Sequence, residues 1–352
     1  MEIEFEINES MKDWAEKAKA VFDRLQDDES RVLFNLKNRL MTDLIDDNEA
    51  WVDEMSKLYS DWNPQGFLND YKDNIVIYGS GHDGRIIANI LRNAGITPKC
   101  FCETPKPFKE KIDGISVECI DDIIEDYKNA YIIASEKYRH EIYAYLLNRK
   151  ISTNHIYIPS YRYPMISRGN QYFDVFEPDD EEVFLDAGAY DGDTLGRFYN
   201  WAGKNAKSAY AIELLPEMCD KIAGMGKNRD ITVINGAAWS VEETLYFSDL
   251  GTASRIADTG MTAVAGIPID CIEYNKIPTF IKMDIEGAEY NALQGARNTI
   301  RKYKPKLAIC VYHKPNDVVE LGKYILELVP EYKLWIRHYT TLIYETVMYA
   351  SL

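Results

Sequence analysis

Three carboxylic acids stand close together after an apolar run. Asp284 and Glu286 lie at the end of a predicted strand over residues 279–285, and Glu289 follows where a helical pattern begins. A strand that ends in acids places them where open α/β sheets bind ligands. Because carboxylates this close repel one another, one acts as a base with a raised pKa, or the group shares a cation. We take Asp284 and Glu286 as candidate catalytic residues and Glu289 as a candidate substrate residue, although an acid also suits a first helical turn.

His313 follows the next predicted strand, 306–312, so we expect it at the same edge of the sheet. Histidine titrates near neutrality and is a natural base for a hydroxyl proton, which makes His313 the third candidate catalytic residue. The alternative is a rim histidine that a hydrogen bond holds in place. The sequence has no HExxH motif and no paired histidines at metal-binding spacing, so a divalent metal is left open without a ligand set.

A second strand-like run, 182–187, ends in an acid and a glycine-bearing turn. The pattern Asp186-x-Gly188-x-x-x-Gly192 begins with the acid, as sites for S-adenosylmethionine do, whereas NAD sites begin with glycine. S-adenosylmethionine carries a sulfonium and an ammonium against one carboxylate, and it has no phosphates to bind. The sequence therefore predicts cofactor-binding residues in this loop, namely Asp186, Gly188, Tyr190, Asp191 and Thr194.

The chemistry of each group suggests its part in binding the cofactor. Asp186 would orient the loop, Asp191 would take the ammonium, and Thr194 with backbone N–H groups would receive the carboxylate. Glu213 ends the next strand, 27 residues after Asp186, where an acid suits a bidentate hold on ribose hydroxyls. Small residues after the strand 231–236, including Ala238, would let the adenine edge lie against backbone.

Residues 240–278 form an excursion between the third and fourth strands of this sheet. Such an insertion could cover an acceptor, with Ser254 and Arg255 as polar contacts. An ordinary β-hairpin explains the same residues equally well.

The motifs 185–189, 282–289 and 293–296, with 310–314 and the tail 337–350, closely resemble the FkbM-family methyltransferases. The resemblance covers roughly residues 172–351, and the block 282–289 is its most specific part. It implies a class I α/β fold, S-adenosylmethionine as methyl donor, and O-methylation of a sugar or polyketide-type hydroxyl, without fixing the acceptor. Five predicted parallel strands followed by an antiparallel hairpin, 333–338 and 342–349, are the strand count of that fold.

Residues 73–159 also alternate between strand and helix patterns and predict a small Rossmann-like domain. Gly79, Gly81 and Gly84 form a G-x-G-x-x-G motif between a strand and a helix, and Glu103 follows 19 residues after Gly84. This loop predicts either a site for a nucleotide or nucleotide-sugar, or a tight turn with no ligand. The segment is similar to the small domain found before some such methyltransferases and before sugar-modifying acyltransferases.

The first segment is helical in pattern and acidic. Residues 1–70 hold 18 acids and 8 bases, so they carry 8 − 18 = −10 of the net charge of −17. We expect three parts: a helical segment over 1–70, the small Rossmann-like domain over 71–160, and a methyltransferase domain over 161–352. The helices would pack on the next domain or on a second subunit, which allows a homo-oligomer.

Composition limits the remaining classes of function. The net negative charge disfavours a nucleic-acid partner, since such partners bind through Lys and Arg. No apolar run is long enough to span a bilayer, the first residues do not resemble a signal peptide, and the six scattered cysteines favour the cytoplasm. The leading hypothesis is an S-adenosylmethionine-dependent O-methyltransferase that acts on a sugar, a glycan precursor or a related small molecule. The alternatives are a nucleotide or nucleotide-sugar sensor with a degenerate methyltransferase domain, and an interaction protein assembled through the acidic helices.

Overall fold

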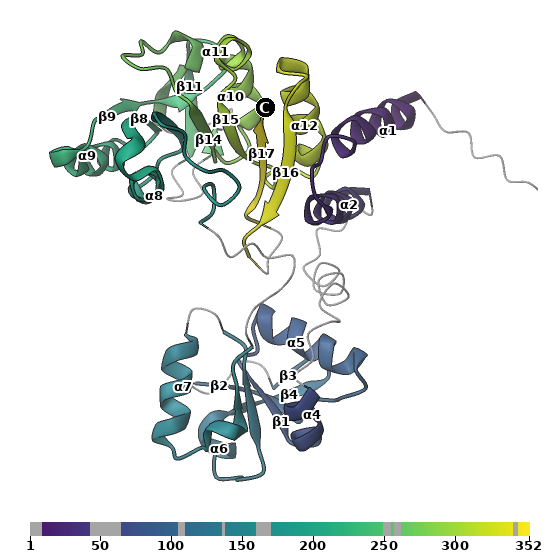
Figure 1. The fold of residues 1–352 in the computed structure, drawn as a ribbon. Helices are drawn as coiled ribbons and strands as arrows, with labels where there is room; N and C mark the ends of the chain where they lie inside the picture. The colour runs from purple at the N-terminus through teal and green to yellow at the C-terminus, as the bar shows by residue number, and fades with distance from the viewer. Residues whose placement is uncertain are drawn as a thin grey trace, which may run out of the picture. The chain divides into compact units, whose positions relative to one another are not determined.

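The computed structural model describes residues 9–42, 65–104, 110–135, 138–159, 170–248, 255–256, 262–340 and 344–352. These residues group into two compact units (Figure 1). The first unit takes its described residues from Met1–Leu44, Ser167–Tyr339 and Tyr344–Leu352, and the second from Ile45–Ile166 and Thr340–Ile343. The division differs from the three expected parts, because the described helices of the first 44 residues group with the C-terminal half of the chain.

A seven-stranded sheet forms the centre of the first unit. Its strand order is β16-β17-β15-β14-β7-β8-β9, in which β17 alone runs antiparallel to its neighbours. The bounds are β7 Glu182–Ala187, β8 Ala206–Glu213, β9 Ile231–Asn235, β14 Phe280–Met283, β15 Lys306–Cys310, β16 Lys333–His338 and β17 Thr346–Ser351. The expected mixed α/β fold, with parallel strands and a C-terminal antiparallel hairpin, is confirmed.

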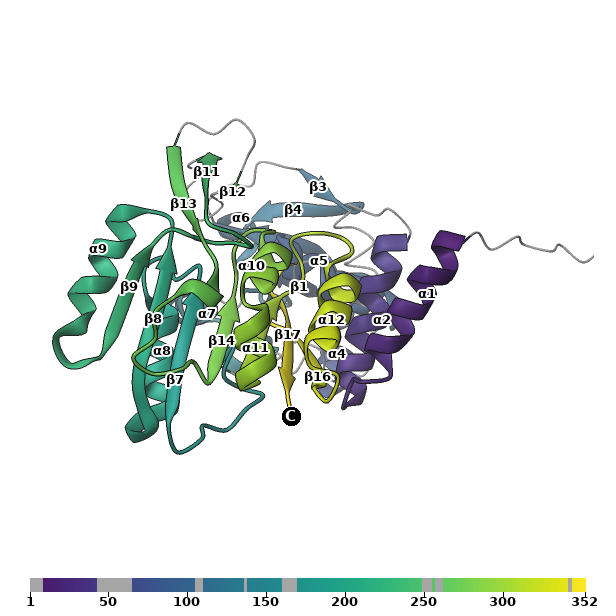
Figure 2. The ribbon, with the colours of Figure 1, turned by 90° about the horizontal axis from the view of Figure 1, so that it is seen from above.

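Apolar side chains cover both faces of this sheet, since β7 and β14 are buried along their whole lengths. One face packs on α8, α9 and the aromatic residues of 172–176, and Phe184 stacks on Phe198 with ring centroids 4.9 Å apart. The opposite face carries α10, α11 and α12 (Figure 2). The bounds are α8 Asp193–Ala202, α9 Pro216–Gly224, α10 Glu289–Gly295, α11 Arg297–Tyr303 and α12 Asp317–Leu328.

The excursion between β9 and β14 contains a small second sheet. Its strand order is β10-β13-β11-β12, and β11 pairs antiparallel with β13. The bounds are β10 Ala237–Ala238, β11 Glu243–Ser248, β12 Arg255–Ile256 and β13 Thr262–Ile267. Within the described part of 240–278, the antiparallel pair β11 and β13 agrees with the hairpin alternative.

The N-terminal helices α1 (Glu9–Phe22) and α2 (Asp28–Thr42) lie beside α12 and the edge strand β16 (Figures 1 and 2). Leu25, between the two helices, forms a parallel bridge with Leu334 of β16. Val21, Leu25 and Leu33 are fully or almost fully buried. The apolar faces of these helices are thus covered by α12 and by β16, the edge strand of the seven-stranded sheet. The bridge at Leu334 also covers part of this strand edge, which would otherwise be open to pairing with another chain.

The second unit is a six-stranded sheet with the order β3-β4-β2-β1-β5-β6, in which only the short β3 is antiparallel. Its strands are β1 Ile75–Tyr78, β2 Cys100–Glu103, β3 Lys111–Ile112, β4 Ile115–Cys119, β5 Ala130–Ile133 and β6 Ile156–Tyr157. Its helices are α4 Gln65–Tyr71, α5 His82–Asn93, α6 Ile120–Ile123 and α7 Arg139–Asn148. None of the described helices of the chain is long and apolar enough to cross a membrane.

Candidate active site

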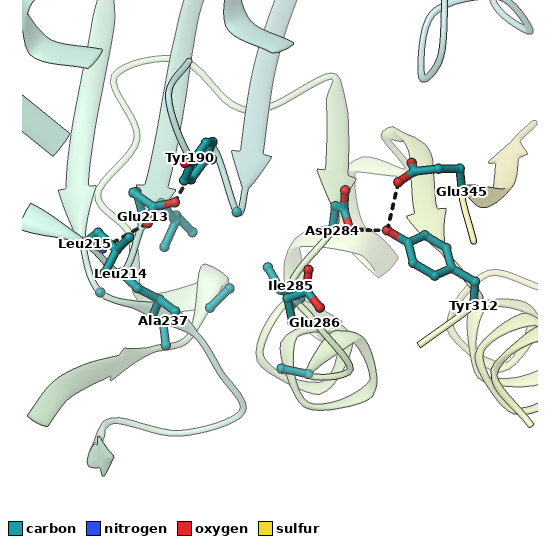
Figure 3. Close-up of a pocket in the computed structure, with 15 residues that line it drawn as sticks. Tyr190, Glu213, Leu214, Leu215, Ala237, Asp284, Ile285, Glu286, Tyr312 and Glu345 are labelled. Carbon is teal, nitrogen blue, oxygen red and sulfur yellow. Dashed lines mark hydrogen bonds between the residues drawn. The ribbon is translucent and has the colours of Figure 1, made fainter. Parts of the chain in front are cut away.

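A cavity of about 280 Å³ opens at the C-terminal ends of β7, β8 and β14 in the first unit. Figure 3 shows residues from β8 and the loop after β7 on one side, and residues that follow β14 and β15 on the other. Open parallel sheets bind ligands at this edge. The lining residues are Gly188, Tyr190, Ile212, Glu213, Leu214, Leu215, Gly236, Ala237, Ala238, Asp284, Ile285, Glu286, Ala288, Tyr312 and Glu345.

Gly188 lets the two sides of the cavity approach each other. Its φ is +78°, and a Cβ at this position would lie 2.0 Å from the carbonyl oxygen of Asp284. Only glycine meets both demands without a shift of the backbone. The loop after β7 therefore lies directly against the end of β14, which brings the predicted cofactor loop next to the predicted catalytic acids.

Asp186 is buried beneath the loop and does not line the cavity. Its Oδ1 lies 2.9 Å from Nζ of Lys282 on β14, which also donates a hydrogen bond to the carbonyl oxygen of Gly188 at 2.8 Å. Burial lowers the pKa of Lys282, but the charges of Asp186 and Asp284 raise it by more, so the amine stays protonated. The pair thus fixes the loop, which is the orienting part predicted for Asp186.

Glu213 presents a carboxylate at the end of β8. Its Oε2 accepts the backbone N–H of Tyr190 at 2.8 Å, and its Oε1 accepts that of Leu215 at 2.9 Å (Figure 3). These bonds fix the side chain, yet each carboxylate oxygen can accept a further hydrogen bond. Glu213 therefore combines a rigid position with acceptor capacity toward the cavity.

Asp284 lies on the other side of the cavity, and two phenols hold its carboxylate. Tyr172 donates to Oδ2 at 2.8 Å and Tyr312 donates to Oδ1 at 3.2 Å. Burial raises the pKa of Asp284, but Lys282, His313 and the Tyr172 hydroxyl lower it by more, so the pKa lies below its ordinary value. Asp284 is therefore a fixed anion beside the cavity.

His313 is surrounded by carboxylates and its side chain is only 5% exposed. Nδ1 lies 2.9 Å from Oε1 of Glu289, whereas Nε2 lies 3.6 Å from Asp284 and 3.7 Å from Glu286. Burial lowers the pKa of His313, but these three acids raise it by more, so the pKa lies above 6.5. Glu289 also accepts the N–H groups of Ile285 and Gly287, which ties the imidazole to the turn after β14.

The residues around His313 include possible ligands for a divalent cation. Asp284, Glu289 and His313 each offer one ligand atom, and these atoms lie within 4.8 Å of one another. However, the two ring nitrogens face different carboxylates, so the imidazole itself lies between Glu289 and Asp284. A histidine that binds a metal through one ring nitrogen commonly donates from the other to a carboxylate, as Nδ1 could to Glu289, so a divalent metal here stays a prediction.

The structure separates some predicted residues from the cavity. Asp191 is paired with Lys221, whose Nζ lies 3.0 Å from Oδ2, and Thr194 is half-buried on α8; neither lines the cavity. Glu289 is buried and begins α10, as its alternative reading predicted. Ser254 lies outside the described residues, and only the backbone of Arg255, on β12, is described. Gly188, Tyr190, Glu213, Ala238, Asp284 and Glu286 do line the cavity. His313 does not line it and lies next to Asp284 and Glu286.

Sequence reasoning missed three residues around Asp284, which are Tyr172, Tyr312 and Glu345. Tyr312 stands next to His313 and could have been found from that position, because it follows the same strand. Tyr172 lies before β7 and Glu345 before β17, in segments without a strand-end motif. Figure 3 shows the Tyr312 hydroxyl between Asp284 and Glu345, 3.5 Å from Oε1 of the latter.

In the second unit, the glycine motif forms the turn between β1 and α5. A Cβ on Gly84 would lie 2.0 Å from the carbonyl oxygen of Gly79, whose φ is +108°, so close packing requires both glycines. A Cβ on Gly81 would meet nothing within 4 Å. Glu103, which follows the motif by 19 residues, accepts the hydroxyl of Ser80. The packing of the turn therefore explains why Gly79 and Gly84 are glycines, but it does not explain Gly81. A nucleotide ligand at this loop stays a prediction.

Comparison with known proteins finds a family model that matches part of the chain and several similar solved structures. Residues 186–339 match the family model described as the methyltransferase FkbM domain. Among curated proteins, no sequence matched the chain. Among solved structures, methyltransferase FkbM from Methylobacillus flagellatus KT is similar with 18% identity and a TM-score of 0.47, covering 86% of this chain and 100% of that chain. Aeropyrum pernix fibrillarin, with natively bound S-adenosyl-L-methionine, has 12% identity and a TM-score of 0.34 over 52% of this chain and 71% of that one.

Proposed function

We propose that the protein transfers a methyl group from S-adenosylmethionine to a hydroxyl group, because residues 186–339 match the family model described as the methyltransferase FkbM domain. The acceptor is a sugar, a glycan precursor or a related small molecule. The observation that carries the proposal is the cavity itself, which has the fixed carboxylate of Glu213 on one side and Asp284 and Glu286 on the other, with His313 next to these two acids. The free cysteines suit a reducing compartment, so we place the reaction in the cytoplasm.

The cofactor lies on the Glu213 side in this proposal. Glu213 accepts hydrogen bonds from the two ribose hydroxyls, since its backbone partners already hold it in position. The small residues Ala237 and Ala238 line the cavity nearby and leave room for a flat base. Gly188 places the loop backbone beside Asp284, so the sulfonium lies near carboxylates, where its positive charge is favourable.

The acceptor hydroxyl lies on the Asp284 side, in line with the methyl carbon and sulfur. Its oxygen forms a bond to the methyl carbon while the carbon–sulfur bond breaks and the electron pair moves to sulfur. The hydroxyl proton moves through Asp284 or Glu286, which line the cavity, to Nε2 of His313. His313 accepts it in its neutral form, which predominates above its raised pKa, and Glu289 beside Nδ1 orients the ring. Asp284 and Glu286 face the imidazolium that forms and stabilise its charge.

Calorimetry with S-adenosylmethionine and S-adenosylhomocysteine tests the proposal without an acceptor. We expect both to bind the purified full chain. Glu213→Gln should lower the affinity for both compounds by about tenfold to a hundredfold, because it removes charged hydrogen bonds to the ribose. The matched control is Glu217→Gln, an exposed acid in the first turn of α9, which should bind like the parent. If neither compound binds at millimolar concentration, the proposed function is wrong.

A further inference from the structure

Glu345 reaches the cavity from the far end of the chain. It precedes β17, and the pairing of β17 with β15 brings it beside Asp284. Gln171 donates a hydrogen bond to its Oε2 at 2.6 Å, and the Tyr312 hydroxyl lies 3.5 Å from its Oε1. Burial raises the pKa of Glu345 and the charge of Asp284 raises it further, whereas the pKa of Asp284 is lowered. The methyl-transfer step described above gives Glu345 no part.

The backbone around the cavity is held in an uncommon conformation. Tyr190, Glu286 and Glu345 have φ of +44°, +55° and +60°, and all three line this cavity. A non-glycine residue in the left-handed region is strained, and such residues gather at binding and catalytic sites. The strain at Glu345 therefore suggests that its side chain is held at the cavity for binding rather than for the stability of the hairpin.

The acceptor side of the cavity is rich in carboxyl groups. Asp284, Glu286 and Glu345 line it, and Glu289 lies behind His313. Among the described basic groups nearby, Lys282 is committed to Asp186 and Lys314 directs an exposed amine to the carbonyl oxygen of Gly287. His313 lies among Asp284, Glu286 and Glu289 and does not line the cavity. An acceptor with a phosphate or carboxylate next to its reacting hydroxyl would be repelled here, whereas neutral hydroxyl groups can donate to the carboxyl oxygens.

We propose that Glu345 binds a second hydroxyl group of the methyl acceptor, so that the acceptor is an uncharged molecule with two neighbouring hydroxyls, such as a diol of a sugar ring. The inference rests on the proposed function and adds the class of acceptor to it. One hydroxyl faces Asp284 and Glu286, next to His313, and reacts, and its neighbour donates to Glu345. Tyr312, whose hydroxyl lies between Asp284 and Glu345, spaces the two subsites.

Binding of simple glycosides tests the proposal. The probes are the methyl glycosides of glucose, galactose, mannose and rhamnose, with those of glucuronate and galacturonate as matched anions. Saturation-transfer difference NMR measures the affinity of each glycoside for the full chain, in the presence of enough S-adenosylhomocysteine to fill the cofactor site. We expect at least one neutral glycoside to bind, and its uronate to bind more weakly. Glu345→Gln should lower the affinity for the neutral glycoside by about tenfold. It should also reduce the difference in affinity between the neutral glycoside and its uronate.

Controls make each outcome decisive. Glu331→Gln removes an exposed acid paired with Lys304 and should leave every affinity unchanged. Glu345→Asn repeats the test with a residue that tolerates positive φ, in case Glu345→Gln folds poorly. If no neutral glycoside binds, if the uronates bind as well, or if both variants bind like the parent, the inference is wrong while the proposed function stands. Failure of S-adenosylhomocysteine to bind the parent overturns both.

Discussion

The pKa of His313 is a measurable consequence of the carboxylates that surround its ring. Three carboxylates lie within 3.7 Å of its ring nitrogens, and they raise its pKa above 6.5 despite burial. We expect a titration by proton NMR to place the pKa of His313 above 6.5. The chain has five histidines, so His313→Gln assigns the resonance. A raised pKa stabilises the folded state fully below pH 6.5, and this contribution is lost as the pH rises through the folded pKa.

Two isosteric variants separate the causes of that shift. Glu289→Gln keeps an oxygen for the N–H groups of Ile285 and Gly287 but removes the charge 2.9 Å from Nδ1, so the pKa of His313 should fall. Glu286→Gln removes a charge 3.7 Å from Nε2 and should lower the pKa by less. A parent pKa at or below 6.5, or a Glu289→Gln variant that titrates like the parent, contradicts the assigned geometry.

The sequence predicts residues of the cavity where a strand end fixes their position. Gly188, Glu213 and Asp284 follow or end strands that run side by side, so their meeting follows from the topology. Asp191 and Thr194 stand only a few residues beyond Gly188, but the loop turns and takes them away from the cavity. Tyr172 and Glu345 depend on left-handed backbone, with φ of +74° and +60°, which no apolar pattern announces.

The N-terminus of α2 gives a prediction about the stability of a single helix. Asp27 precedes it, and its Oδ1 accepts the backbone N–H of Ser30 at 2.9 Å, the geometry of an N-cap. Arg337 of β16 also donates to Asp27 at 2.6 Å. Asp27→Ala should therefore lower the free energy of unfolding by about 1 kcal/mol, measured in urea. Asp28→Ala, which removes an exposed acid paired with Arg31, should cost less. Equal costs would show that Asp27 is no cap.

The acidity of Asp27 gives this prediction a pH dependence. Burial raises its pKa, but Arg337 and Ser30 lower it by more, to about 2. A depressed carboxyl pKa stabilises the folded state above pH 3.8, and this contribution is lost as the pH falls toward 2. The difference between the parent and Asp27→Ala should therefore shrink in acid.

The long strands were predictable because the parallel strands of a covered sheet are continuous apolar runs. The predicted runs at 182–187 and 306–312 became β7 and β15, and the final hairpin became β16 and β17. The short strands β3 and β4, within 111–119, were not predicted, because Lys111 and Glu118 interrupt their apolar pattern. Length and burial therefore decide which strands a single sequence reveals.

The contact pattern of the whole chain could not be predicted from the spacing of apolar residues. That spacing predicts helices in the first segment, and α1 and α2 confirm them within the described residues. It does not say which surface the helices cover. Leu25 bridges Leu334, some 300 residues away, and only the folded chain reveals that partner. The helices therefore belong to the unit that holds the cavity rather than to a separate arm.

This assignment predicts that a change in α2 destabilises the unit that binds the cofactor. Leu33 is 0% exposed on the side of α2 that faces β16, and its neighbour Val32 is 37% exposed. Leu33→Ala should cost about 2–5 kcal/mol in the unfolding transition that S-adenosylhomocysteine shifts upward, whereas Val32→Ala should cost far less. Differential scanning calorimetry with and without S-adenosylhomocysteine identifies that transition. If α1 and α2 instead served only to join subunits, Leu33→Ala would change the molecular mass of the protein in solution. The temperature of the unfolding transition that S-adenosylhomocysteine shifts would then stay the same.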